Sequence, residues 1–286
     1  MRGLLPQGNK GQQHGHNRMT QDRDAQYLKT VVDPIRVCAK YKPKFGQGRR
    51  SGLALPEFQS LYQADPFYAW FGLDNPLMYA AHKAAGGMTS VYRQIGIGCE
   101  KLFRQILCDQ FGLSTKAANW SYTVPTAGGK IRTLYLDGRV SLADIKDHIV
   151  RKRFHDWMER AATAAGVAPA IFSSLTGTIF EVRQGYKSKD SKRQNADIAN
   201  AATAYTNAYL PCAVILSAQI DGDILLRYRA ERWSILTGVV GLNDPLQSTY
   251  DFINQVVGYD MAGFFQRNSV VLKKEIDSVL RALLTA

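Results

Sequence analysis

Hydrophobic residues recur with a helical period in some parts of the chain and with a strand period in others. The aromatic and apolar stretch 66–85 predicts a core helix or a pair of helices, and 98–111 predicts an amphipathic helix. The period then changes, because alternating residues over 120–124 and 131–136 predict two strands joined by the turn 126–129. A β-hairpin is therefore expected to follow the first helices.

The second half of the chain predicts a further alternation of helices and strands. Helices are expected over 141–165, 196–209 and most of 223–286, and strands over 178–184 and 211–217. Ser141 and Asp144 resemble a capping box at the start of the first of these helices. The run 211–217 is continuously apolar, which is typical of a strand buried on both faces.

A strand, a helix and a buried strand in succession predict an α/β fold with a central mixed β-sheet flanked by helices. Additional helical segments are expected at the N- and C-terminal ends. We expect a disordered polar leader at 1–24, a helical region with a basic arm at 25–97 and a core at 98–222. A helical region at 223–286 would then pack on the core or form a dimer interface.

The charge balance points to a polyanionic partner. The chain carries 36 Lys and Arg residues against 24 Asp and Glu residues, for a net charge of +12 and a pI of about 9.5. Such a surplus favours nucleic acid, because each neutralised phosphate releases counterions; a solvated basic surface is the alternative. Segment 36–50 includes Lys40, Lys42 and Lys44 and no acid. It is either a mobile arm that follows a phosphate backbone or a solvated loop.

Several classes of protein find no support in the sequence. The four cysteines are scattered without a CxxC pair, so we expect buried reduced thiols in an intracellular protein and no zinc cage. No apolar stretch has transmembrane length, and the N-terminus lacks the apolar core of a signal peptide, so we expect a soluble cytoplasmic protein without a membrane partner. No Walker loop, GxGxxG turn or zincin motif is present, and we expect no organic cofactor.

Two acidic residues lie where strands are predicted. Asp137 ends the second strand of the hairpin, where Gly138 lets the chain turn away. Glu181 lies inside the strand 178–184, and it shares a face with Arg183 because strand side chains alternate. An acid in an otherwise apolar strand is unfavourable unless it is exposed or has a ligand.

A pair of acids on neighbouring strands with a cation beside them is the device that phosphodiester hydrolysis needs. Mg²⁺ prefers carboxylate oxygens and water as ligands, and it activates water and stabilises charge on the phosphate. The competing interpretation is structural: Glu181 pairs with Arg183 or Arg139 on a solvated face.

The order of these features resembles the PD-(D/E)XK nuclease family. An acid at a strand end is followed by a strand of pattern hydrophobic-Glu-hydrophobic-basic at 180–183, then by a helix and a buried strand. The resemblance covers 98–217 and implies a restriction-endonuclease-like core with Mg²⁺ ligands at Asp137 and Glu181. Many type II restriction enzymes of this family also carry a glutamate on the preceding helix, and Glu100 fits that place.

Two departures from the family pattern leave alternatives open. The usual lysine is replaced by Arg183, which can hold a phosphate oxygen but does not lose its proton near neutrality, so Lys187 is the alternative catalytic cation. A whole helix separates Asp137 from Glu181, and Asp156 on that helix competes as the first acid. We favour Asp137 because a strand end is the more rigid platform.

The segment after Glu181 is dense in the side chains that read guanine and adenine edges in the major groove. The candidate DNA-binding residues there are Lys187, Lys189, Lys192, Arg193, Gln194 and Asn195. The alternative is a soluble basic loop that caps a helix.

These features together predict a type II restriction endonuclease, a Mg²⁺-dependent and site-specific deoxyribonuclease acting on double-stranded DNA. Glu100, Asp137 and Glu181 would bind Mg²⁺ directly or through water, and Arg183 or Lys187 would hold the scissile phosphate. We expect a homodimer, because two copies related by a two-fold axis cut both strands most simply. The alternatives are a non-catalytic DNA-binding regulator, which needs no clustered acids, and a structure-selective repair nuclease with the same core.

Overall fold

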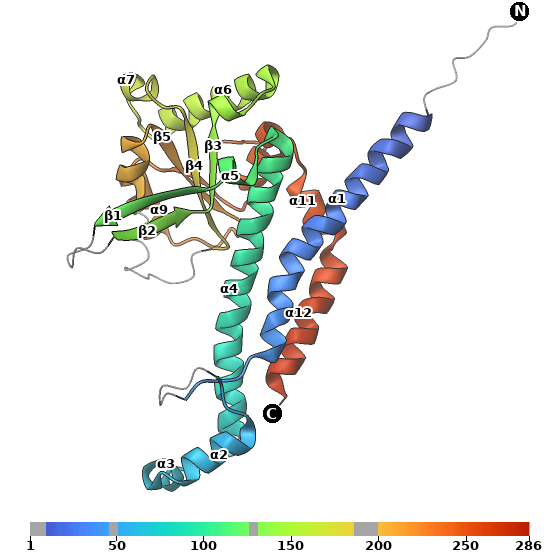
Figure 1. Ribbon diagram of the computed structural model, residues 1–286, viewed down its shortest axis with the longest axis vertical. Coiled ribbons are helices and arrows are strands. Elements are labelled where there is room, and N and C mark those ends of the chain that lie inside the picture. The colour runs from blue at the N-terminus through green and yellow to red at the C-terminus, as the bar shows by residue number, and fades with distance from the viewer. Residues whose placement is uncertain (1–9, 46–50, 126–130, 186–199, 286) are drawn as a thin grey trace, which may run out of the picture.

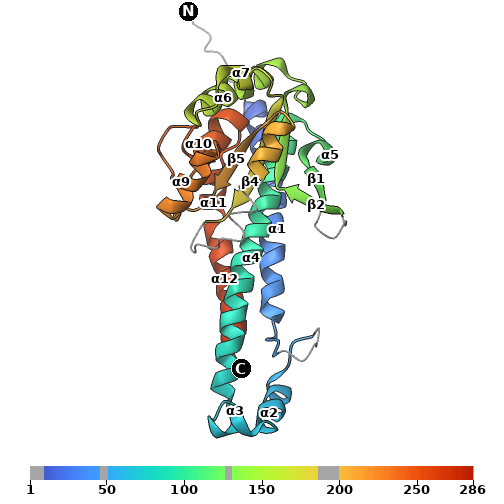
Figure 2. The ribbon, with the colours of Figure 1, turned by 90° about the vertical axis from the view of Figure 1, so that its left-hand side faces the viewer.

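The chain folds into a helical stem and a lobe that contains the β-strands, as two views of the computed structural model show (Figure 1, Figure 2). The structure describes residues 10–45, 51–125, 131–185 and 200–285. Three helices form the stem: α1 (Lys10–Arg36), α4 (Pro76–Phe111) and α12 (Ser269–Leu284). Helix α4 continues from the stem into the lobe and packs there on the sheet.

Glycines on α4 allow the stem helices to approach closely. A Cβ atom at Gly98 would lie 3.0 Å from the carbonyl oxygen of Val31 on α1. A Cβ atom at Gly87 would lie 2.5 Å from the side chain of Leu283 on α12. Segments from the two ends of the sequence are thus packed against the same central helix, which brings the predicted helical N- and C-terminal parts together.

Helix α1 begins at Lys10, so the disordered leader expected over 1–24 does not hold for 10–24. Polar contacts tie this helix to the rest of the chain: Tyr27 donates a hydrogen bond to Asp109 of α4 (2.6 Å), and Asp24 accepts one from Tyr259 (2.8 Å). Burial raises the pKa of both tyrosines, which keeps them protonated as donors. The composition of the segment does not predict the helix, because the residues that contact it are distant in sequence.

The lobe contains a four-stranded mixed sheet in the order β3-β4-β5-β6, which confirms the predicted α/β class. The strands are β3 (Gly138–Ser141), β4 (Gly177–Arg183), β5 (Tyr209–Ile215) and β6 (Ser234–Leu236). β3 runs antiparallel to β4, whereas β4 with β5 and β5 with β6 are parallel. β5 is buried at all but its first residue, as its apolar run predicts.

One face of the sheet forms the main hydrophobic core. Phe180 and Val182 of β4 are buried there with the alternate residues of β5. They pack against α4, α6 (His148–Ala164) and the π-helical segment η3 (Phe252–Val257). This face carries most of the aromatic contacts of the lobe, such as Phe180 with Phe103 of α4.

The opposite face of the sheet is covered by smaller clusters. Ala213 and Ile215 of β5 pack with α9 (Gly222–Ala230), and Ile179 of β4 packs with residues from the helical stretch 200–206. The predicted hairpin is present as an antiparallel two-stranded sheet of β1 (Trp120–Pro125) and β2 (Ile131–Leu136). Trp120 and Leu136 of this hairpin join the cluster around Ile179. Glu181 and Arg183 share this face by alternation.

Two boundaries beside the site differ from the prediction. The chain bends at Asp137 and leaves the hairpin, as expected, but a further strand, β3, begins at once at Gly138 and pairs with β4. The helix expected from residue 141 begins at His148, where Asp147 caps it by accepting two N–H groups of its first turn (2.8 and 3.2 Å). Ser141 lies instead in β3, because pairing with β4 takes precedence over a local capping pattern.

The aromatic segment predicted as core forms the far end of the stem. Helices α2 (Leu55–Gln63) and α3 (Pro66–Trp70) lie there, away from the sheet (Figure 1). Trp70 is 81% exposed and Phe71 is 67% exposed. The prediction of a core helix was therefore wrong over α3, although the following residues do enter the buried part of α4.

The rest of the described chain consists of short elements. They are η1 (Val37–Lys40), α5 (Thr115–Ala118), η2 (Leu142–Asp144), α7 (Pro169–Phe172), α10 (Thr249–Asp251) and α11 (Met261–Arg267). The last third is mostly helical, as predicted, with β6 as the exception. Within the described ranges, no helix is both long enough and apolar enough to cross a membrane.

The cysteines offer a direct test of the packing. All four are buried and free, as the sequence predicts. Burial raises the pKa of the thiols of Cys99 and Cys212 from 9.0 to about 12. Since the thiolate is the reactive species, neither residue should react with iodoacetamide at pH ~8 in the native protein. Mass spectrometry should find both alkylated only after unfolding, and rapid native modification of Cys212 would contradict the buried position of β5.

Candidate active site

The candidate site lies where β3 begins beside β4. The register that pairs Gly138 with Phe180 places Asp137 opposite Glu181 on the neighbouring strand. Asp137 donates its N–H to the carbonyl oxygen of Phe180 (3.0 Å), and its carboxylate accepts the N–H of Val182 (2.8 Å). Both the main chain and the side chain of Asp137 are therefore held by β4.

Glu181 is a buried charge, only 4% exposed. Arg183 forms an ion pair with Glu181, and its Nη1 lies 3.8 Å from Oδ2 of Asp137. One guanidinium thus compensates two carboxylates in a region with little water. The pairing of Glu181 with Arg183 exists, but in the interior rather than on a solvated face, and Arg139 instead donates to the carbonyl oxygen of Ala117 (2.8 Å).

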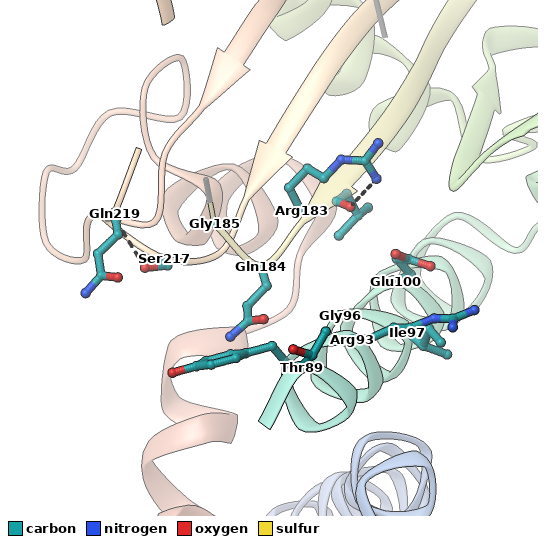
Figure 3. Close-up of a pocket in the computed structure, with 12 residues that line it drawn as sticks. Thr89, Arg93, Gly96, Ile97, Glu100, Arg183, Gln184, Gly185, Ser217 and Gln219 are labelled. Carbon is teal, nitrogen blue, oxygen red and sulfur yellow. Dashed lines mark hydrogen bonds between the residues drawn. The ribbon is translucent and has the colours of Figure 1, made fainter. Parts of the chain in front are cut away.

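Helix α4 approaches the same carboxylates from the side. Arg104 donates its Nε–H to the carbonyl oxygen of Asp137 (2.7 Å). Glu100 lies one helical turn earlier and, together with Arg183, lines a pocket between α4 and the sheet (Figure 3). The helix therefore positions the main chain of one acid and contributes another.

The pocket has a volume of about 720 Å³ and lies at the carboxyl ends of the parallel strands β4 and β5. Gln184 follows β4, while Ser217 and Gln219 follow β5, and all three line the pocket. Figure 3 shows Gln184 extending toward α4 and Glu100 extending from α4. The carboxyl edge of parallel strands is the usual ligand-binding edge in α/β proteins.

Sequence reasoning missed the lining residues that come from the earlier part of α4. Thr89, Arg93 and Gly96 line the pocket beside Glu100. These four residues follow one another at spacings of four, three and four, which is one face of a helix. That spacing was available, but the prediction began the amphipathic helix at 98 and did not extend the face backwards.

Asp156, the competing first acid, lies elsewhere. It is on α6, where its carboxylate accepts a hydrogen bond from Lys152 one turn earlier (2.6 Å) and its side chain is half exposed. This contact with Lys152 lowers the pKa of Asp156. Its partners Lys152 and His155 are neighbours on its own helix, whereas Asp137 contacts the strand that carries Glu181. The geometry favours Asp137 as the acid beside Glu181.

The lysines of the basic arm are far from this pocket. Lys40, Lys42 and Lys44 are all exposed, near the α2–α3 end of the stem. The segment is anchored there, because the ring of Phe45 packs on Phe58 at 4.7 Å. The other candidate DNA-binding residues, which are Lys187, Lys189, Lys192, Arg193, Gln194 and Asn195, lie outside the described residues.

Among the described residues of the site, Asp137 and Glu181 carry carboxylate oxygens, which are the ligands that a hard cation prefers. In the part of the chain that the structure describes, no three acidic, His or Cys side chains are close enough together to hold a metal ion. Arg183 instead lies against the carboxylates of Asp137 and Glu181. The carboxylate oxygens of Asp137 and Glu181 are donors of the kind that Mg²⁺ prefers, whereas within the described residues Glu100 is not grouped with these two acids.

Comparison of the chain with protein-family models, with curated proteins and with solved structures gives no match.

The ion pair at the site predicts a stability effect that depends on divalent cations. Arg183→Ala should lower the free energy of unfolding by about 3–5 kcal/mol, because it removes the guanidinium from the buried carboxylate of Glu181 and the partly buried carboxylate of Asp137. Mg²⁺ should raise the melting temperature of this variant more than that of the wild type, since the added cation no longer competes with the guanidinium. Thermal unfolding with and without Mg²⁺ measures both effects.

A matched control is Arg281→Ala, which removes an exposed Arg–Asp pair on α12 and should change stability little at any Mg²⁺ concentration. Wild-type stability of Arg183→Ala without Mg²⁺ would show that the carboxylates do not depend on the guanidinium.

Proposed function

We propose that this protein is a type II restriction endonuclease that hydrolyses phosphodiester bonds at specific sites in double-stranded DNA with Mg²⁺ as cofactor. The arrangement of Asp137, Glu181 and Arg183 carries the proposal. It is a largely buried group of charges where β3 begins beside the inner strand β4, next to a pocket that Glu100 and Arg183 line. Such a group is a weak source of stability, and functional sites are where proteins commonly gather closely spaced charges with little exposure to water.

The order of elements supports the likeness to PD-(D/E)XK nucleases. Helix α4 with Glu100 comes first, and Asp137 follows directly before β3. Glu181 and Arg183 lie in β4, and the chain then passes through the helical stretch 200–206 into β5, which is buried and parallel to β4. We assign these elements to a restriction-endonuclease-like core, to which the stem helices are added.

Each side chain of the site is given a role that follows from its chemistry. When bound, Mg²⁺ supplies an activated water and stabilises charge on the phosphate. Asp137, Glu181 and Glu100 would hold it, directly or through water. Arg183 would leave Glu181 and bind a phosphate oxygen, because a guanidinium matches phosphate geometry but does not act as a base. Lys187, outside the described residues, stays the alternative cation.

DNA recognition follows from position and charge. The segment with Lys187, Lys189, Lys192, Arg193, Gln194 and Asn195 comes shortly after Gly185, which lines the pocket. Sequence-specific contacts from it would therefore begin beside the cut phosphate. Arg93 on α4 adds a cation to the pocket wall.

The first test separates the two candidate acids. Asp137→Ala should reduce the cleavage rate about a thousand-fold or more, since a metal ligand supplies several kcal/mol to the transition state. Binding to cognate DNA should persist or tighten, because a negative charge near phosphate is lost. Digestion of a plasmid of known sequence with Mg²⁺, with the ends mapped, measures cleavage, and gel shift in Ca²⁺ measures binding.

Asp156→Ala is the matched control, because it removes an acid of the same type from the exposed face of α6. It should cut at the normal rate. If Asp137→Ala cuts at the normal rate and Asp156→Ala is inactive, then Asp156 is the first acid of the site. If the wild type itself does not cut DNA, the proposed function is refuted.

The second test concerns the basic arm. Replacing Lys40, Lys42 and Lys44 with alanine should weaken binding to all DNA sequences alike, because backbone contacts carry no sequence information. The slope of log affinity against log salt should fall by about one per lost contact. Replacing the exposed Lys273 and Lys274 of α12 is the control. An unchanged slope in the arm variant would mean that the arm is a solvated loop.

A further inference from the structure

The stem ends in an apolar surface that the described chain leaves uncovered. Phe67 is 58% exposed, Trp70 81%, Phe71 67% and Leu77 81%. These four residues, here named the tip surface, lie on α3, on the turn after it and on the first turn of α4. They are at the opposite end of the stem from the sheet (Figure 1, Figure 2). We propose that the tip surface binds the tip surface of a second copy of this chain.

The backbone beneath the tip surface is ordered by its own capping interactions. Asp65 accepts the N–H of Phe67 (3.0 Å) at the start of α3, and Asn75 accepts the N–H of Met78 (2.9 Å) at the start of α4. Behind them, the rings of Phe58 and Tyr62 pack at 4.3 Å in a small separate core. The backbone that carries the exposed side chains is thus held by local contacts, which favours a preorganised binding surface.

The exposed area is large enough for a specific contact. Three aromatic side chains and a leucine at these exposures leave on the order of 600 Å² open to water, the upper end of what a monomer usually shows as its largest apolar patch. Burial of the same surface on two copies removes about 1,200 Å², the lower limit for a specific protein–protein interface. Tryptophan and phenylalanine are also the residues that interfaces concentrate at their centre.

The charges around the tip surface select the partner. Asp65 and Asp74 flank the aromatic segment, while Lys40, Lys42 and Lys44 lie on the arm anchored at the base of the same end. The two acids are adjacent in sequence to the exposed aromatic residues, whereas the lysines belong to a separate segment, so the acids disfavour an anionic partner at the tip surface itself. A two-fold interface brings the same apolar patch from both sides, so a second copy matches the tip surface without requiring a partner of opposite charge.

A two-fold axis parallel to the stem would leave both lobes on the same side of the contact. The contact itself uses no residue of the candidate active site, so it stands or falls independently of the proposed hydrolysis.

The test is the mass in solution of the full-length protein, measured by size exclusion with light scattering over a range of concentrations. The wild type should be a dimer. Trp70→Glu should shift the dissociation constant at least about a hundred-fold, as expected for a central aromatic anchor, and give a monomer with an unchanged far-ultraviolet spectrum. Phe71→Ser is the second variant, in case Trp70→Glu disturbs α3.

Val270→Glu is the matched control, because Val270 is a comparably exposed apolar residue on α12, outside the tip. It should remain a dimer, as should Asp137→Ala, whatever its activity. The proposal would be overturned if the wild type were a monomer, if both tip variants remained dimers, or if Val270→Glu also dissociated the dimer. If the wild type is a monomer and Trp70→Glu binds DNA more weakly than the wild type does, the tip surface is a DNA contact instead.

Discussion

The burial of Glu181 in the middle of β4 is the constraint around which the lobe is organised. A carboxylate in this position needs a cation within reach, and Arg183 on the same strand face provides it. Asp137 is then drawn into the same group by hydrogen bonding to the main chain of β4. The group contributes little net stability compared with an apolar core, and removal of its cation leaves uncompensated charge. Such a weakly stabilising ion pair is compatible with the proposed site, in which a metal ion would take the place of the guanidinium.

Helix α4 links this group to the rest of the molecule. One of its faces enters the hydrophobic core through Phe103 and its neighbours. Elsewhere on the helix, Glu100 lines the pocket and Arg104 donates to the carbonyl oxygen of Asp137. Its earlier part supplies the close contacts of the stem and ends at the tip surface. A single rigid helix therefore connects the pocket with the proposed contact between copies. The catalytic proposal and the self-association proposal thus share a scaffold without sharing residues.

Much of the fold could be predicted from local patterns. The amphipathic face around Leu102 and Phe103, the hairpin β1–β2 and the buried run of β5 were all visible as periodicities. Glu181 and Arg183 could be placed on one strand face by alternation alone. The strand β3 was not predictable, because it depends on pairing with β4, which is distant in sequence. The start of α6 at His148 has a local signal in the cap Asp147, which the prediction passed over in favour of Ser141.

The sequence by itself determined that the chain has an α/β lobe, that Glu181 and Arg183 share a face, and that the protein carries a basic surplus. Periodicity and composition are local or additive properties, and they need no knowledge of contacts. Only the tertiary structure decided that Asp137 rather than Asp156 lies beside Glu181, and that the aromatic segment around Trp70 is exposed. Strand register and the packing of one element on another decide which acids meet and which apolar side chains are covered, and neither is encoded in a local pattern.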